Sequence, residues 1–222
     1  KRIFAHGWWT NEGKKISKSL GNVINPIEII NQYGLDQIRY FVLREITFGN
    51  DGDFSISALK SRINADLSND LGNLCQRSLT MINKHCNSRI PRGNNISDTE
   101  KKFLSKLFNL LPALSLHIDN QEINLYLKKI WDIVAETNKY FNDNKPWELK
   151  DTNKKSFENI LYVTADIIKQ IAIMIYPVMP QTSVKILSLF SIEEDSIKID
   201  SLNINIENIE LGNVKPLFPR VE

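Results

Sequence analysis

Apolar residues recur every three or four positions through most of the chain after residue 57. This spacing puts them on one face of a helix, because an α-helix has 3.6 residues per turn. Three long series of this kind predict helices over residues 59–81, 127–141 and 157–175. Ser97 and Glu100 have the spacing of a capping box, so a further helix is expected to begin there. Several amphipathic helices in succession indicate an α-helical bundle.

The first 56 residues follow a different pattern. The β-branched and aromatic run Ile3–Thr10 predicts a strand, and Asn11-Glu12-Gly13 after it predicts a tight turn. A short helix is expected to begin at Pro26, because proline is favoured in the first helical turn. We expect Asp36 to cap a second short helix.

The C-terminal third adds two expectations. Pro177 and Pro180 interrupt the helical pattern and predict a break. The tail, residues 197–222, alternates loosely and predicts a small strand pair. The predicted fold is therefore mainly α, with a short β-containing segment over residues 1–56 followed by an α-helical bundle with its C-terminal tail over residues 57–222.

The composition excludes several classes of protein. Hydrophobic residues make up 42% and charged residues 24%, which is typical of a globular domain. No stretch approaches 18 uncharged apolar residues, so no membrane contact is expected. Cys75 and Cys86 are too few for a disulfide framework, which favours a reducing, cytoplasmic location. Together with three histidines they offer no zinc-ligand spacing, so no metal site is expected.

The net charge of +2 conceals an uneven distribution. Residues 57–157 carry 16 Lys and Arg against 11 Asp and Glu, whereas residues 158–222 carry 5 against 9. A basic middle section is consistent with a polyanionic partner, although such an excess is more often ordinary solvated charge on helix faces. Four of its cations are candidates for phosphate contacts on charge alone: Arg62, Lys84, Arg89 and Arg92.

The segment between the first turn and the first helix has the composition of a phosphate-binding loop. Three lysines and two serines fall within Lys14–Ser19, and Gly21 permits a sharp reversal. Lysine ammonium groups, serine hydroxyls and loop amides all suit phosphate oxygens. Taken alone, a loop of this composition is more often a solvated turn.

Lys15-Ile16-Ser17-Lys18-Ser19 resembles the KMSKS signature of class I aminoacyl-tRNA synthetases, with Ile16 in the methionine position. The wider pattern is similar to the methionyl-tRNA synthetase family in particular, over essentially the whole chain. The strings that carry this resemblance are His6-Gly7-Trp8-Trp9, Gly21-Asn22, Pro26, Asp36 with Arg39-Tyr40, Asp51-Gly52-Asp53-Phe54-Ser55 and Pro216-Leu217-Phe218-Pro219-Arg220.

The resemblance implies that the loop closes over ATP while methionine is activated. By this analogy Lys18 carries the main electrostatic role on the departing pyrophosphate, and Lys15 assists it. Ser17 and Ser19 would shape the loop, and Ile16 would keep an apolar anchor. ATP and Mg²⁺ are thus expected for the full-length enzyme, with nothing held tightly by this chain alone.

The resemblance also implies a missing half. The family's nucleotide-binding domain, with its HIGH motif and methionine pocket, should precede Lys1, and no His-x-Gly-His string occurs here. Zinc, where present, belongs to that half. We therefore expect the C-terminal part of a longer methionine–tRNA ligase, inactive without its catalytic domain in cis, and we expect a monomer.

A second cluster of residues suits the recognition of unpaired RNA bases. Asn73 and Arg77 are four residues apart on one predicted helix, and Trp147 follows Pro146 at a helix junction. From the residues alone, a structural interpretation is as good as RNA recognition: Trp147 would be a core side chain and Arg77 a surface charge. The family favours recognition, because its LGNL-x-x-R and KPW strings meet the CAU anticodon of tRNA-Met. The resemblance therefore assigns anticodon binding to Asn73, Arg77 and Trp147.

Two other functions fit parts of the sequence. A stand-alone tRNA-binding module would keep the bundle but would have no use for Lys15 and Lys18. A fragment of another class I synthetase, such as a cysteinyl or leucyl enzyme, would lack the strings around Asn73 and Trp147.

Several further residues have structural interpretations. We expect Trp131 to be core, and His85 and His117 to lie at the surface without partners. Arg39 is expected to form an ion pair that joins the loop segment to the bundle. Gly72, in mid-helix, is expected at a close helix crossing.

Overall fold

The computed structural model describes residues 3–94 and 96–222; Lys1, where we expect a preceding domain to join, lies outside them. Its N-terminal part contains a small sheet in the order β2-β1-β3. β1 (Trp9–Asn11) is antiparallel to β2 (Lys14–Lys15) and parallel to β3 (Gly52–Phe54). The predicted strand over Ile3–Thr10 is therefore wrong except at its last two residues, because the preceding residues find no neighbouring strand.

Short helices follow the sheet. A 3-10 turn, η1 (Lys18–Leu20), leads into α1 (Pro26–Tyr33) and α2 (Leu35–Glu45). Pro26 stands in the first turn of α1, as predicted. The expectation that Asp36 caps α2 is wrong, because Gly34 takes the cap position and the Asp36 carboxylate accepts a hydrogen bond from the amide of Thr182 at 2.6 Å.

The remaining chain is a helical bundle, which confirms the predicted fold class. The first long predicted helix is present, but it is built of α3 (Ile56–Arg62), a π-helical stretch η2 (Ile63–Gly72) and α4 (Asn73–His85). The other helices are α5 (Asp98–Leu104), α6 (Lys106–Asp119), α7 (Ile123–Asn144), α8 (Pro146–Leu149), α9 (Lys154–Ile175) and α10 (Pro180–Ser188). Ser97 and Glu100 form the predicted capping box of α5.

Helix α9 is the centre of the core. Nearly every residue from Phe157 to Ile175 is buried, so the second half of this helix is covered on all faces, its polar side chains Asp166, Lys169 and Gln170 included. α4, α7, α8 and α10 pack around it. Trp131 on α7 is 6% exposed, which confirms its predicted place in the core.

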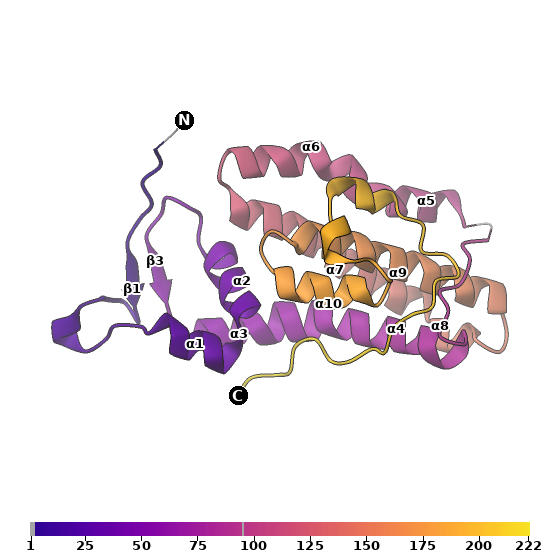
Figure 1. The fold of residues 1–222 in the computed structure, drawn as a ribbon, viewed down its shortest axis with the longest axis horizontal. Coiled ribbons are helices and arrows are strands. Elements are labelled where there is room, and N and C mark those ends of the chain that lie inside the picture. Colours follow the sequence, from indigo (N-terminus) through magenta and orange to yellow (C-terminus); the bar gives the residue numbers. More distant parts are fainter. Residues whose placement is uncertain (1–2, 95) are drawn as a thin grey trace.

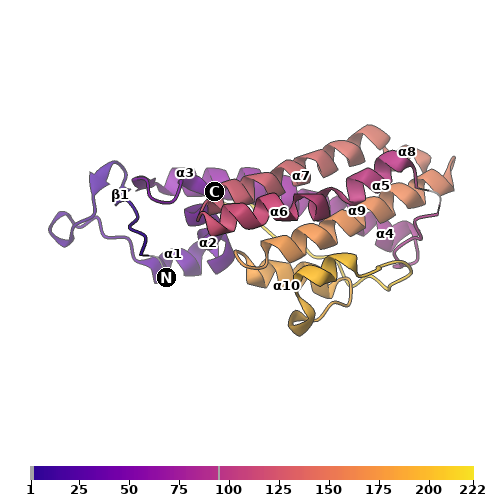
Figure 2. The same cartoon turned by 90° about the horizontal axis from the view of Figure 1, so that it is seen from above.

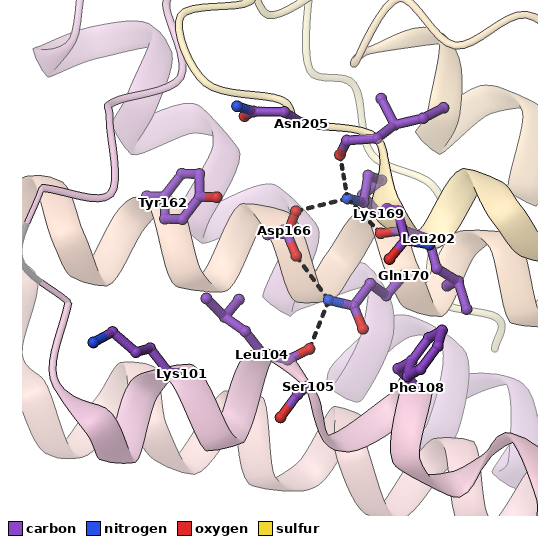
Figure 3. A pocket seen from close by; sticks show the side chains of 12 residues that line it. Lys101, Leu104, Ser105, Phe108, Tyr162, Asp166, Lys169, Gln170, Leu202 and Asn205 are labelled. Carbon is purple, nitrogen blue, oxygen red and sulfur yellow. Dashed lines mark hydrogen bonds and ion pairs between the residues drawn. The ribbon is translucent and has the colours of Figure 1, made fainter.

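The tail contains no strand pair among the residues described, so that prediction is wrong. Two 3-10 turns, η3 (Glu194–Ser196) and η4 (Ile199–Asn203), occupy part of it, and its one bridge joins Glu210 to Arg89. A buried cation fastens it instead: the Lys169 ammonium, 1% exposed, donates to Asp166 at 2.7 Å and to the carbonyls of Leu202 and Ile204 (Figure 3).

The molecule is elongated, with the sheet at one end and α8 at the other (Figures 1 and 2). After residue 205 the tail runs back beneath α4 towards α3. There Asn64 exchanges two hydrogen bonds with the backbone of Val221, at 2.8 and 3.0 Å. Lys15 lies in β2 of this sheet and Trp147 lies in α8, so the loop over Lys15–Ser19 and Trp147 are at opposite ends of the molecule.

Helix α2 joins the N-terminal segment to the bundle. Arg39 does so without the expected ion pair, because it donates to the carbonyls of Val178 at 2.6 Å and Pro177 at 2.9 Å. These carbonyls follow the end of α9, where unpaired acceptors suit a cation. Since Asp36 meets the first turn of α10, one face of α2 binds both sides of the α9–α10 turn.

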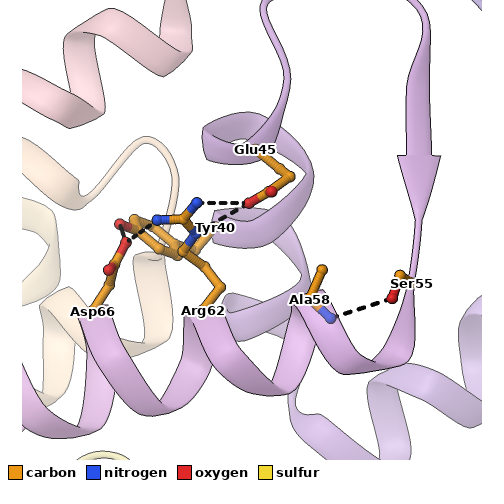
Figure 4. Close-up of polar contacts among 6 residues, drawn as sticks. All are labelled: Tyr40, Glu45, Ser55, Ala58, Arg62 and Asp66. Carbon is orange, nitrogen blue, oxygen red and sulfur yellow. Dashed lines mark hydrogen bonds and ion pairs between the residues drawn. The ribbon is translucent and has the colours of Figure 1, made fainter.

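A second polar cluster supports this junction (Figure 4). The Tyr40 hydroxyl donates to Asp66 at 2.6 Å, and Arg62 bridges Asp66 and Glu45 at 3.2 and 2.9 Å. Burial and the neighbouring Asp66 raise the pKa of Tyr40 well above its usual range, so it remains a donor at neutral pH. No helix among the described residues has the length and hydropathy of a membrane span.

Candidate functional site

The loop over Lys14–Ser19 is organised by Asn22. The Asn22 side chain accepts from the amide of Ser17 at 2.9 Å and donates to the carbonyl of Lys15 at 3.0 Å. Its own carbonyl accepts from the side chain of Asn11 at 2.8 Å. One asparagine therefore joins both sides of the loop to β1, which holds the loop's base in a fixed conformation while its tip remains exposed.

The two serines shape the tip. Ser17 caps η1 by accepting from the amide of Ser19, and their hydroxyl oxygens lie 2.7 Å apart. Gly21 ends the turn at φ 64°, a left-handed conformation that favours glycine. Ile16 is half-buried. These positions agree with the shaping and anchoring roles expected from the sequence, which stay predictions.

Lys15 and Lys18 have exposed side chains, and neither has an ion-pair partner within residues 3–94 and 96–222. The carboxylates nearby serve the sheet instead. Asp53 accepts from Thr10 and from the amide of Gly13 at 2.7 Å, which lowers its pKa. Asp51 accepts from the amide of Trp8 at 2.7 Å. The loop thus presents uncompensated positive charge, as a phosphate-binding loop requires.

At the far end of the molecule, the Arg77 guanidinium lies over two neighbouring aromatic rings. Its guanidinium carbon is 5.3 Å from the ring centre of Phe141 and 5.7 Å from that of Trp147. Asn142 accepts a hydrogen bond from Arg77 at 2.8 Å. Cation–π contacts of this length, with a hydrogen bond, hold a guanidinium in a defined orientation. Arg77, Phe141 and Trp147 line a pocket of about 380 Å³.

Trp147 is 39% exposed, so it is not a core side chain. Lys145 ends α7 in a left-handed conformation at φ 44°, and Pro146 starts α8. This abrupt turn places the indole at the rim of the bundle, where one part packs near Phe141 and the remainder faces solvent. The geometry suits stacking of a planar ligand.

Asn73 does not join Arg77 in the same pocket. It is exposed and lines an adjoining pocket of about 350 Å³ with Arg220 and Phe218 of the tail. Gln76 lines both pockets and so connects them. The i, i+4 spacing correctly predicted one helix face, but the returning tail divides that face into two hollows.

Gly72 is not at a helix crossing, so that expectation is wrong. A Cβ there would lie 2.8 Å from the carbonyl oxygen of Leu67, within the π-helical stretch, and 3.5 Å from the ring of Phe218. Glycine is therefore needed by the π-helix, whereas the contact with the tail would be an ordinary van der Waals contact. π-helical turns are rare and are frequent at functional sites, and this one ends where Asn73 begins.

Sequence reasoning missed several residues of these sites. Asn22 was noted only as part of a string and Phe141 only as a helix residue, and Asn142 was not noted at all. No local signal marks Asn142, because its contact with Arg77 depends on how α7 packs against α4. His117 was expected to lack a partner, but it lies 2.7 Å from Glu122.

Comparison with known proteins agrees with this arrangement. The family model described as "tRNA synthetases class I (M)" matches residues 1–79, and "Anticodon binding domain of methionyl tRNA ligase" matches residues 90–216. The second match alone covers more than half of the chain. The chain belongs to the methionyl-tRNA ligase family. Membership of this family excludes the alternative that the chain is a fragment of a cysteinyl or leucyl enzyme.

Curated relatives in this family are similar along the whole chain. The methionine–tRNA ligase of Brucella suis biovar 1 is 41% identical over 222 residues, which is 99% of this chain and 43% of that protein. The Rhizobium meliloti ligase is 40% identical over the same shares. This chain therefore spans less than half the length of the ligases it matches.

Solved structures agree with the fold. Mycobacterium tuberculosis methionyl-tRNA synthetase in complex with methionyl-adenylate superposes with a TM-score of 0.94 and 38% identity, over 99% of this chain and 44% of that one. Its apo form gives 0.91 and 35%, over all of this chain and 44% of that one.

Proposed function

We propose that this chain is the C-terminal part of a methionine–tRNA ligase, which joins methionine to tRNA-Met with ATP. In this proposal the loop of Lys15–Ser19 serves amino-acid activation, and the pockets along α4 recognise the CAU anticodon. The observation that carries the proposal is Arg77, whose guanidinium lies over the rings of Phe141 and Trp147 beside the pocket of Asn73. An oriented guanidinium and a half-exposed indole are the groups that read and stack an unpaired base.

The loop's role is electrostatic. When the methionine carboxylate attacks the α-phosphate of ATP, negative charge grows on the departing pyrophosphate. Lys18, and Lys15 beside it, are exposed and uncompensated, so their ammonium groups are available to that charge. Interactions that strengthen in the transition state accelerate the step. Ser17, Ser19 and Asn22 hold the loop in shape.

ATP and Mg²⁺ belong to the proposal for the full-length enzyme. No group of three or more His, Cys, Asp or Glu within the described residues could hold a metal ion. In this proposal the phosphates of ATP supply ligands of Mg²⁺. The catalytic domain in cis, the monomeric state, the cytoplasmic location and a boundary near residue 56 stay predictions.

Arg77→Lys in the full-length enzyme tests the anticodon assignment. Lysine keeps the charge but loses the planar fork that Asn142 and the two rings orient. We expect methionylation of tRNA bearing CAU to fall by about tenfold or more in kcat/KM, in line with a lost bidentate or stacked contact. Pyrophosphate exchange without tRNA should be unchanged.

Two outcomes would contradict the proposal. Equal methionylation of CAU and altered anticodons by the wild-type enzyme would place recognition elsewhere. The stand-alone tRNA-binding module would be favoured if the full-length protein bound tRNA with CAU preference yet showed no methionine-dependent pyrophosphate exchange.

A further inference from the structure

Four cations of the basic middle section differ in what they contact. Arg62 is neutralised by Glu45 and Asp66 at the junction with α2. Arg89 donates to the carbonyl of Asn208 at 3.2 Å and lies 3.6 Å from Glu210, so it helps to hold the tail. Contacts within the fold thus explain why both positions carry an arginine.

Lys84 and Arg92 have no such role. Both are exposed, and in the part of the chain that the structure describes neither has an ion pair or a side-chain hydrogen bond. Lys84 lines the pocket of Arg77 and Trp147. Arg92 lines a different pocket, of about 320 Å³, between the end of α4, the segment after it and the first turn of α9.

The two pockets adjoin. His85 lines both, so the hollow of Trp147 continues past the end of α4 into the hollow of Arg92. Arg77 and His85 are eight residues apart on one helix, which is roughly 12 Å along its axis. A strand whose base lies on Trp147 would therefore have neighbouring backbone phosphates within the length of this surface.

The charge of the Arg92 pocket is positive. Lys154 also lines it, 3.8 Å from Glu158, the carboxylate that lines the same pocket. Lys154 stands in the first turn of α9, which holds no acidic residue and where a cation is disfavoured by the helix dipole. The helix dipole therefore does not explain a lysine at this position, whereas its pairing with Glu158 one turn further on and an anion in the pocket both would.

We propose that the pocket of Arg92 and Lys154 binds a backbone phosphodiester of the RNA whose base occupies the Trp147 pocket, and that Lys84 contributes a second backbone contact. The identity of the ligand as RNA rests on the proposed function, whereas the site rests on the cations and the shared His85. Contacts to phosphate position the strand and carry no sequence information. Their loss weakens binding to every anticodon equally and lowers its salt dependence.

The test compares two RNA hairpins, one with CAU in its loop and one with an altered anticodon, bound to the full-length protein. Fluorescence anisotropy gives Kd over a series of KCl concentrations. Arg92→Ala should raise Kd for both hairpins by the same factor, and should reduce the slope of log affinity against log salt by about 0.7, the value for one phosphate contact on a single strand. Lys84→Ala should act likewise, and Arg92→Lys should restore the slope.

Lys128→Ala is the matched control, because Lys128 is an exposed lysine on α7 that lines neither pocket. It makes the same change in net charge. The thermal midpoint of each variant shows that the fold is retained, which the exposure of Lys84 and Arg92 leads us to expect.

The outcomes separate the two proposals. An unchanged slope in Arg92→Ala, or the same change in Lys128→Ala, overturns the phosphate site while the CAU preference of the wild type stays intact. Loss restricted to the CAU hairpin also overturns it. Absence of any CAU preference in the wild type refutes the proposed function instead. Replacing chloride by inorganic phosphate at constant ionic strength tests for a site that binds free phosphate. If phosphate inhibits RNA binding to the wild type but not to Arg92→Ala, and Arg92→Ala leaves the slope of log affinity against log salt unchanged, the RNA assignment is overturned.

Discussion

Trp147→Ala gives the most direct test of the anticodon site, because the structure fixes what the indole contacts. Trp147 is 39% exposed. Its ring packs near the ring of Phe141 and lies over the guanidinium of Arg77. Its removal therefore affects two separable quantities, the free energy of unfolding and the affinity for RNA.

The expected loss of stability follows from burial. Truncating a core tryptophan to alanine costs about 3–5 kcal/mol. Because about three-fifths of Trp147 is covered, we expect about 2–3 kcal/mol. For a chain of this size that lowers the thermal midpoint by roughly 4–12 °C. Calorimetry would measure it, and the variant should remain folded at 25 °C.

The expected loss of affinity is separate. Stacking on an aromatic ring contributes roughly 1–3 kcal/mol per base, and Arg77 also loses one of its two ring contacts. We expect binding of a CAU hairpin to weaken about 10- to 100-fold at 25 °C. A hairpin with an altered anticodon should lose less, because a base that does not fit the pocket stacks less fully on the indole. Pyrophosphate exchange should not change, since the loop of Lys18 lies at the other end of the molecule.

Two controls separate stacking from stability. Trp147→Phe keeps an aromatic platform and should recover most of the affinity. Trp131→Ala removes a tryptophan that is 6% exposed and donates to the carbonyl of Asp66, so it should destabilise the protein more yet leave the ratio of the two affinities unchanged. If Trp147→Ala left the affinity for the CAU hairpin unchanged, the stacking role would be refuted.

Four further predictions follow from other parts of the structure. Lys18→Ala should lower the rate of activation by about 10²–10³ with little change in methionine KM, measured by pyrophosphate exchange in the full-length enzyme; a change in KM alone would contradict the role. Residues 1–222 alone should give no methionine-dependent exchange, and exchange above background would refute this. Lys169→Met should destabilise the protein by about 3–5 kcal/mol in urea unfolding, because Asp166 and two carbonyls lose their buried cation; a change below 1 kcal/mol would be inconsistent with that pair. Burial raises the pKa of Glu100, but hydrogen bonds from Tyr140 and Ser97 outweigh it, so the net pKa lies below the ordinary 4.5. A lowered native pKa gives stability that is present above pH 4.5 and is lost as the pH falls through the native value, and Glu100→Gln should abolish that part of the acid dependence.

The sequence by itself determined the bundle, because helical periodicity depends on neighbours three and four residues apart. Phe157–Ile175 and the capping box of Ser97 and Glu100 were found for this reason. The loop of Lys15–Ser19 was also found, since its chemistry lies in adjacent residues. Trp147 at a junction was predicted because Pro146 marks a helix start locally.

Only the tertiary structure decided which distant groups meet. Asp36 was predicted to cap its own helix, but it binds the amide of Thr182, 146 residues away. Arg39 found carbonyls at the end of α9 instead of a carboxylate. The contact of Asn142 with Arg77 and the division of the α4 face by the tail likewise depend on packing. Polar partners of this kind are chosen by the distance between elements after the core has formed, and no local spacing in the sequence encodes that distance.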